Sequence, residues 1–268
     1  MSNGERRPGT RRHPSAGNLD DGPELVAEDG AESALPPAAF PWGAEPRSGH
    51  IELGPGLDAE HAEKLLGHLD GKRVLELGCG TGEMAITLAQ AGAKVIAVDA
   101  DMERITEARE TAEMAEIKVE FHHGDIADLA FVRNEQIDFA ISVYALSGVS
   151  DPDRVLRQVH RVLRADAPFL FSVAHPLSLM ARLEPGQTAP NLASTYFDQS
   201  TIGWSSDGES GVSHPHRVGD LVTQMARSNF KVDLVSEPRA ALSADAPYAT
   251  PLAEWVPTTL ILRGRKIA

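Results

Sequence analysis

The chain has 268 residues, 42% of them hydrophobic, which is enough to bury one sizeable core. Its 25 lysines and arginines are outnumbered by 39 aspartates and glutamates, and the resulting net charge of −14 argues against nucleic acid as a partner. The single cysteine, Cys79, excludes an intramolecular disulfide and fits a reducing compartment, and no apolar run reaches membrane-spanning length. We therefore expect a cytoplasmic protein, monomeric or homodimeric, that does not contact membranes.

The first 41 residues differ in composition from the rest. They are rich in proline, glycine, alanine and charge, and their prolines interrupt every possible helix. We expect residues 1–41 to be a disordered tail and residues 42–268 to fold as one domain. The arginine pairs at 6–7 and 11–12 leave open a contact between the tail and an acidic surface.

From residue 74 onward, apolar runs of strand length alternate with amphipathic helical segments. The expected strands occupy 74–77, 94–100, 118–125, 137–146 and 168–176, and helices follow the first, second and fourth of them. Such alternation predicts an α/β, Rossmann-like open sheet that is mostly parallel and has helices on both faces. Ligands of these sheets bind outside the carboxyl ends of the strands, where the strand order reverses.

The last third of the chain departs from this alternation. Residues 176–215 are rich in Pro, Gly, Ser and Asn, and an insertion this long is typical of a lid or binding segment. A helix is expected over 216–230, followed by strands near 230–238 and 257–266 with no helix between them. Two such strands predict an antiparallel edge of the sheet.

Three glycines at alternate positions, Gly78, Gly80 and Gly82, follow the first strand in the sequence GCGTG. Glycines let the backbone turn sharply and approach a ligand without a Cβ in the way. Nicotinamide sites usually space them G-x-G-x-x-G, whereas this loop is G-x-G-x-G with Glu76 two residues before it. The spacing is typical of an S-adenosylmethionine site, and a plain tight turn is the alternative.

Four ordered motifs extend this pattern: VLELGCGTGE, VIAVDAD, GDIADL and FAISVYALSGVSDPDRVLRQVHRVL. With them the chain resembles the class I S-adenosylmethionine-dependent methyltransferases, specifically the type 11 methyltransferase domain group. The resemblance covers residues 70–175 well and extends loosely to 264. It implies a seven-stranded sheet whose last strand inserts antiparallel, and a methyltransferase domain over residues 42–268.

Several positions have a cofactor role by their chemistry and by this resemblance. Glu76 is expected to receive the cationic amine, Asp99 the ribose hydroxyls, and Asp125 the adenine amine. Helix capping is the alternative role for Asp99 and for Asp125. The full expected cofactor set is Glu76, Gly78, Cys79, Gly80, Gly82, Asp99, Ala100, Asp125, Ile126 and Val143.

The residues that would contact the methyl acceptor are less clear from the sequence. Tyr144 and the residues after it stand where the family often has histidines. We take Tyr144 and His175 as candidate catalytic residues, His175 as a base. Packing of Tyr144, and a turn set by His175 before Pro176, are the alternatives. Trp204, His216 and Arg217 are candidate substrate residues, Arg217 for an acidic group. The H-x-H spacing of the HPHR motif lacks surrounding carboxylates, so we expect no metal.

These features favour a methyltransferase that uses S-adenosylmethionine and acts on an oxygen or nitrogen of a small molecule. A tRNA or protein methyltransferase would need a basic face. A non-catalytic cofactor-binding module, and a nicotinamide oxidoreductase, remain as alternatives.

Overall fold

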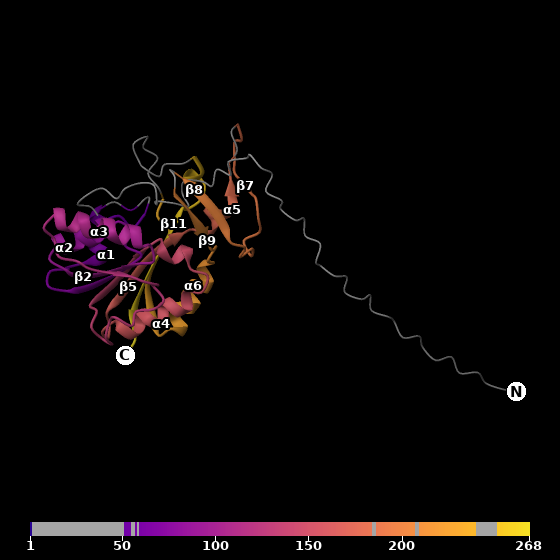
Figure 1. The fold of residues 1–268 in the computed structure, drawn as a ribbon. Helices are drawn as coiled ribbons and strands as arrows, with labels where there is room; N and C mark the ends of the chain where they lie inside the picture. Colours follow the sequence, from indigo (N-terminus) through magenta and orange to yellow (C-terminus); the bar gives the residue numbers. More distant parts are fainter. Residues whose placement is uncertain (2–50, 55–56, 58, 184–185, 207–208, 240–250) are drawn as a thin grey trace. The chain divides into compact units, whose positions relative to one another are not determined.

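The structure is a computed structural model that describes the chain apart from residues 2–50, 55–56, 58, 184–185, 207–208 and 240–250 (Figure 1). The predicted disordered tail lies outside the described residues. Every described helix and strand belongs to one compact unit, Ala34–Ala268. Among the described residues, no helix is both long and apolar enough to cross a membrane.

Seven strands form the central sheet in the order β10-β11-β5-β4-β1-β2-β3. They are β1 (Arg73–Leu77), β2 (Lys94–Asp99), β3 (Glu120–His123), β4 (Phe139–Val143), β5 (Pro168–Ala174), β10 (Phe230–Ser236) and β11 (Thr259–Lys266). Strand β11 pairs antiparallel with β5 and with β10, and the other neighbours are parallel. The predicted fold class, including the antiparallel last strand, is confirmed.

Helices cover both faces of the sheet because successive strand residues point to opposite sides. On one side, Leu75 and Leu77 of β1 join the core beneath α4 (Pro152–Val162) and α6 (Val218–Arg227). On the other side, Val74 packs with α1 (Ala59–Leu66), α2 (Glu83–Gln90) and α3 (Met102–Met114). Helices α4 and α6 are in contact, and Figure 1 shows them side by side.

The strand order reverses between β1 and β4, because the chain proceeds from β1 to β2 and β3 on one side and from β4 to β5 on the other. At such a reversal the two following connections diverge and leave a crevice outside the strand ends. The glycine loop follows β1 here, and the 3-10 turn η2 (Ala145–Gly148) follows β4. The topology therefore brings the two segments to one place.

The segment 176–215 carries its own short elements. These are α5 (Pro176–Met180), the pair β6 (Ala181–Arg182) and β7 (Asn191–Leu192), and the hairpin of β8 (Ile202–Ser206) and β9 (Glu209–Ser213). Near the C-terminus a 3-10 turn, η3 (Pro251–Glu254), precedes β11. Backbone hydrogen bonds connect the insertion to the main sheet unit, since the amide of His214 donates to the carbonyl of Ser147 in η2 at 2.8 Å.

Helix α4 shows how the pattern produces the packing. Asp151 caps it by accepting from the amide of Asp153 at 3.1 Å, and Pro152 occupies its first turn. Val155, Leu156 and Val159 are fully buried against the sheet.

We predict that Leu156→Ala lowers the free energy of unfolding by about 2–5 kcal/mol, because it leaves a cavity beneath α4. The exposed neighbour Arg157 provides the matched control, and Arg157→Ala should change stability by less than about 0.5 kcal/mol. Denaturant unfolding followed by circular dichroism measures both. Equal losses in the two variants would contradict the assigned face of the helix.

Candidate cofactor site

The glycine loop folds back onto the end of β2. The amides of Gly78 and Cys79 donate to the carbonyl of Val98 at 2.8 and 3.2 Å, and the amide of Gly80 donates to the Asp99 carboxylate at 2.8 Å. Gly78, Gly80 and Gly82 all have positive φ, at 75°, 52° and 88°. Other residues rarely adopt this conformation, so the alternating glycines are a requirement of the backbone path.

Close packing adds a second reason for glycine. A Cβ on Gly78 would overlap the Cβ of Ala145 in η2, and a Cβ on Gly82 would lie 2.8 Å from that of Ala108 in α3. The loop after β1 is therefore held between the end of β2, the start of η2 and helix α3. Such contacts define a shaped cradle at the switch point of the sheet.

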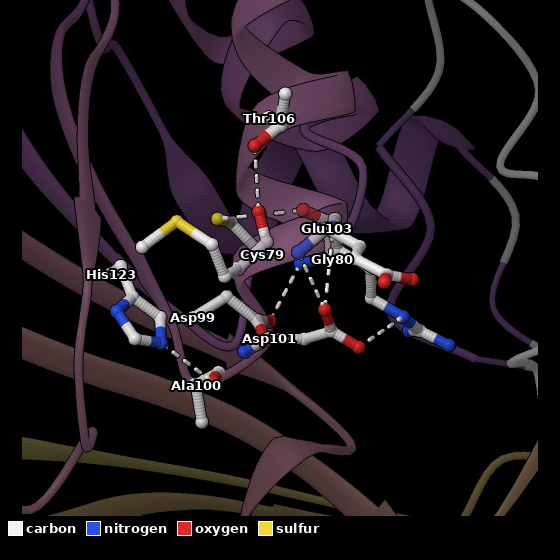
Figure 2. A network of polar contacts seen from close by, with 10 residues as sticks. Cys79, Gly80, Asp99, Ala100, Asp101, Glu103, Thr106 and His123 are labelled. Carbon is white, nitrogen blue, oxygen red and sulfur yellow. Dashed lines mark hydrogen bonds and ion pairs between the residues drawn. The ribbon is translucent and has the colours of Figure 1, made fainter.

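Asp99 organises the corner beside the loop (Figure 2). One carboxylate oxygen accepts from Gly80, and the other accepts from the amide of Asp101 at 2.9 Å. The cap of α3 is Asp101, whose carboxylate accepts from Glu103 and Arg104 at 2.8 and 3.2 Å. Capping therefore does not account for Asp99, and each of its oxygens retains a lone pair for a ligand.

A cavity of about 830 Å³ opens beside this corner. Five of the predicted cofactor residues line it: Gly78, Asp99, Ala100, Asp125 and Ile126. Asp125 accepts from the amide of Ala127 at 2.8 Å in a local turn, and the short helix considered as an alternative for this segment does not form. Ile126 is buried, so its apolar side chain can form one wall for a planar ring.

Sequence reasoning missed other residues that line the same cavity, among them Arg104, His123 and Val149. The Nε2 of His123 lies 3.0 Å from the carbonyl oxygen of Ala100. The signal that could have found it is its position at the carboxyl end of β3, two residues before Asp125.

Glu76 lies on β1 directly before the loop and is 3% exposed. Its Oε2 has no hydrogen-bond partner among the described residues. Burial raises the pKa of this carboxyl well above its usual value, and the nearby acids Asp99 and Glu83 raise it further. A buried carboxyl oxygen without a donor indicates a place for a ligand that carries a cationic donor.

The arrangement fits S-adenosylmethionine. The glycine cradle admits a ligand close to the backbone, Asp99 and Asp125 at successive strand ends offer acceptors, and Glu76 offers a carboxyl to an amine.

Cys79 is buried in the loop, with its Sγ 3.8 Å from the carbonyl oxygen of Gly80. Burial raises the pKa of its thiol, which opposes a nucleophilic role. Val143 is half-buried and packs against the cluster of Tyr144, Ala174 and Leu179.

Tyr144 is 1% exposed and its hydroxyl is hydrogen-bonded to Thr259 of β11. Its φ of 58° is unusual for an aromatic residue. It lies between the last residue of β4 and Ala145, which contacts the glycine loop. This geometry supports packing rather than contact with a reacting group. Its catalytic role remains a prediction that the contacts do not favour.

His175 is 1% exposed, and both of its ring nitrogens are engaged. Nδ1 accepts from the amide of Leu177 at 3.1 Å and caps α5, and Nε2 lies 2.8 Å from the Glu237 carboxylate. Nδ1 therefore carries no proton, and the hydrogen lies on Nε2, directed at Glu237. These contacts favour the turn-setting alternative over the predicted general base.

The HPHR motif lies beside η2. Nε2 of His216 is 3.1 Å from the carbonyl oxygen of Leu146, and the guanidinium of Arg217 pairs with Asp220 at 2.6 Å. Both line a second cavity of about 670 Å³. Gly148 and Val149 line the first cavity, and the next residue, Ser150, lines the second. Both cavities therefore border the segment 148–150.

Trp204 is part of β8, but its side chain lies outside the described part of the chain.

A family model described as "Methyltransferase domain" matches residues 74–166, which include β1, the glycine loop and η2. Magnesium-protoporphyrin O-methyltransferase of Rhodobacter capsulatus is 32% identical over 178 residues, which cover 65% of this chain and 70% of that protein. The chain belongs to the class I S-adenosylmethionine-dependent methyltransferases. The predicted family is therefore confirmed.

Two further comparisons define the extent of this methyltransferase likeness. Ubiquinone biosynthesis O-methyltransferase of Bordetella avium is 32% identical over 116 residues, 43% of this chain and 48% of that protein. The chain thus matches about half the length of this relative. A solved S-adenosylmethionine-dependent methyltransferase from Mesorhizobium loti shares the fold with a TM-score of 0.64 at 24% identity, covering 78% of this chain and 98% of that one.

The environment of His175 in this methyltransferase predicts a pH effect on stability. Burial lowers the pKa of His175 despite the opposing Glu237 carboxylate. The unfolded chain then binds more protons than the folded one near and below the usual histidine pKa of about 6.5, so stability falls as the pH decreases through that value.

We predict that His175→Asn, which keeps a capping oxygen for α5 but cannot titrate, reduces the loss of unfolding free energy between pH 7.5 and 5.5. The exposed His68 supplies the control, since His68→Asn should leave that loss unchanged. Urea unfolding at several pH values measures both. An unchanged pH dependence in His175→Asn would show that His175 is not a buried neutral group.

Proposed function

We propose that this chain transfers a methyl group from S-adenosylmethionine to an oxygen or nitrogen of a small-molecule acceptor. The observation that carries the proposal is the glycine cradle with Glu76, Asp99 and Asp125 at the ends of three neighbouring strands. In this proposal the three acids hold the amine, the ribose and the adenine of the cofactor. Ile126 provides an apolar wall, and Cys79 fills space beneath the loop.

When bound, S-adenosylmethionine supplies a methyl group already activated on a sulfonium. The protein then contributes mainly by holding the two reactants in line and by excluding water. Backbone geometry serves this purpose here, because Asp99 fixes Gly80 and Ala145 packs on Gly78. The residues proposed to bind the cofactor are thus positioned by hydrogen bonds and contacts within the chain itself.

Three observations support a small-molecule acceptor. The relatives named above are O-methyltransferases of ubiquinone biosynthesis and of magnesium-protoporphyrin, which favours an oxygen as the atom methylated. The net charge of −14 opposes binding of tRNA. The insertion is hydrogen-bonded to η2 through His214, and His216 directly after it lies beside η2 as well, so the insertion can cover an acceptor beside the cofactor cavity.

Two of the predicted substrate residues, His216 and Arg217, line the second cavity. The charge of Arg217 is already compensated by Asp220, so an acidic acceptor would compete with that pair. The hydroxyl oxygen of Tyr196 accepts a hydrogen bond from the amide of Val218 at the start of α6, at 3.3 Å.

We predict that Asp99→Ala weakens S-adenosylmethionine binding by about 1–3 kcal/mol, because it removes charge-assisted hydrogen bonds and releases Gly80. Calorimetric titration measures the affinity, and circular dichroism verifies folding. Asp128 is an exposed acid that does not line the cavity, so Asp128→Ala should bind as the unaltered protein does. An Asp99→Ala variant with unchanged affinity would refute the assigned role.

The proposed activity is tested by incubating the protein and S-adenosylmethionine with separate panels of phenolic and carboxylic small molecules, of amines, of bulk tRNA and of unfolded protein. Formation of S-adenosylhomocysteine is the readout. Turnover with the small-molecule panels alone supports the proposal. Turnover with tRNA or protein alone would show that the acceptor is that macromolecule and not a small molecule. Binding of S-adenosylmethionine without turnover in any panel would favour the non-catalytic module.

A further inference from the structure

The carboxyl of Glu76 is the most buried acid around the cofactor cradle, and none of the ion pairs found among the described residues involves it. It lies on β1 in register with Ala97 of β2 and Ile141 of β4, two apolar neighbours. Oε2 has no donor within the described part of the chain. An ionised carboxylate in such a place would lack both water and a counter-charge.

The charged groups nearest to Glu76 make ionisation harder still. Asp99 at the end of β2 and Glu83 at the start of α2 are both acids, and the only other titratable neighbour in the loop, the Cys79 thiol, is neutral. The two acids have other partners, since Asp99 accepts from Gly80 and Glu83 accepts from the hydroxyl of Thr81 at 2.6 Å. Burial and these acids together raise the pKa of Glu76, which favours the protonated carboxyl before a ligand binds.

We propose that binding of the cofactor's cationic amino group displaces the proton of the Glu76 carboxyl, so that Glu76 selects ligands by charge and couples their binding to proton release. This inference rests on the function proposed above and names a specificity residue within that site. The carboxyl O–H bond breaks, its proton passes to solvent, and the carboxylate pairs with the ammonium. No oxidant or further reactant is required.

The pairing has a defined consequence for affinity. A ligand with the ammonium group compensates the buried carboxylate, whereas one of similar shape without it leaves the neutral carboxyl in place. S-adenosylmethionine and S-adenosylhomocysteine both carry the ammonium. 5′-Methylthioadenosine has the adenosine and the sulfur but lacks the amino acid portion, so it separates the contribution of Glu76 from the rest of the cradle.

The experiment is calorimetric titration at about pH 6.5 in buffers of different ionisation enthalpy, in which the dependence of the binding heat on the buffer counts the protons released. The unaltered protein should release a substantial fraction of one proton with S-adenosylmethionine and with S-adenosylhomocysteine, and none with 5′-methylthioadenosine. Affinity for the first two ligands should rise with pH between about 6 and 7.5, since a proton must leave.

Two variants complete the design. Glu76→Gln keeps the shape of the side chain and cannot ionise, so it should bind S-adenosylmethionine at least tenfold more weakly, release no proton and keep its affinity for 5′-methylthioadenosine. Glu107 lies exposed on α3, whereas Glu76 is buried on β1 directly before the glycine loop, and Glu107→Gln should match the unaltered protein in every readout.

The stability of the protein without added ligand distinguishes a purely structural role of Glu76 from the proposed role in ligand binding. Glu76→Gln should have a melting temperature at pH 8 equal to or above that of the unaltered protein, because it removes a destabilised acid. Binding of S-adenosylmethionine without proton release, or equal release in Glu76→Gln, would overturn the inference and leave the proposed function intact. Absence of any binding across this pH range would overturn both.

Discussion

The hydrogen bond from the Gly80 amide to the Asp99 carboxylate, 2.8 Å long, is the constraint on which the rest of the site depends. It joins the loop after β1 to the end of β2, two strands that are already paired in register from Arg73 to Leu77. The loop can follow this path only because its glycines tolerate positive φ. Ala145 then packs where a Cβ on Gly78 would lie, so β4 and its following turn are positioned by the same loop.

The same geometry places a destabilising group where we propose that the amino group of the cofactor binds. Glu76 alternates with Leu75 and Leu77 along β1, and this parity directs its carboxyl into the layer shared with α2 and α3 rather than into solvent. A neutral residue there would suit the core better. The acid therefore makes physical sense as a binding group whose cost is offset when a cationic ligand arrives, as is common for functional sites.

The fold and the backbone path of the glycine loop could be predicted from sequence because their signals are local. Alternating apolar runs gave the strands, and three spaced glycines after Glu76 marked the cradle. The environments of Tyr144 and His175 could not be predicted in this way, because their partners Thr259 and Glu237 lie far along the chain on β11 and after β10. The direction of a side chain at a strand end depends on such tertiary contacts, and these favour packing and capping for two residues that sequence reasoning placed in catalysis.

The central claim, that the cradle formed by Gly78, Gly80, Asp99 and Glu76 is built for S-adenosylmethionine, is tested most directly by titrating the purified protein with S-adenosylmethionine and, separately, with NAD. The account predicts saturable binding of S-adenosylmethionine and no binding of NAD at the same concentrations. Binding of NAD alone would contradict it, because the G-x-G-x-G loop and its acids would then serve a nicotinamide cofactor.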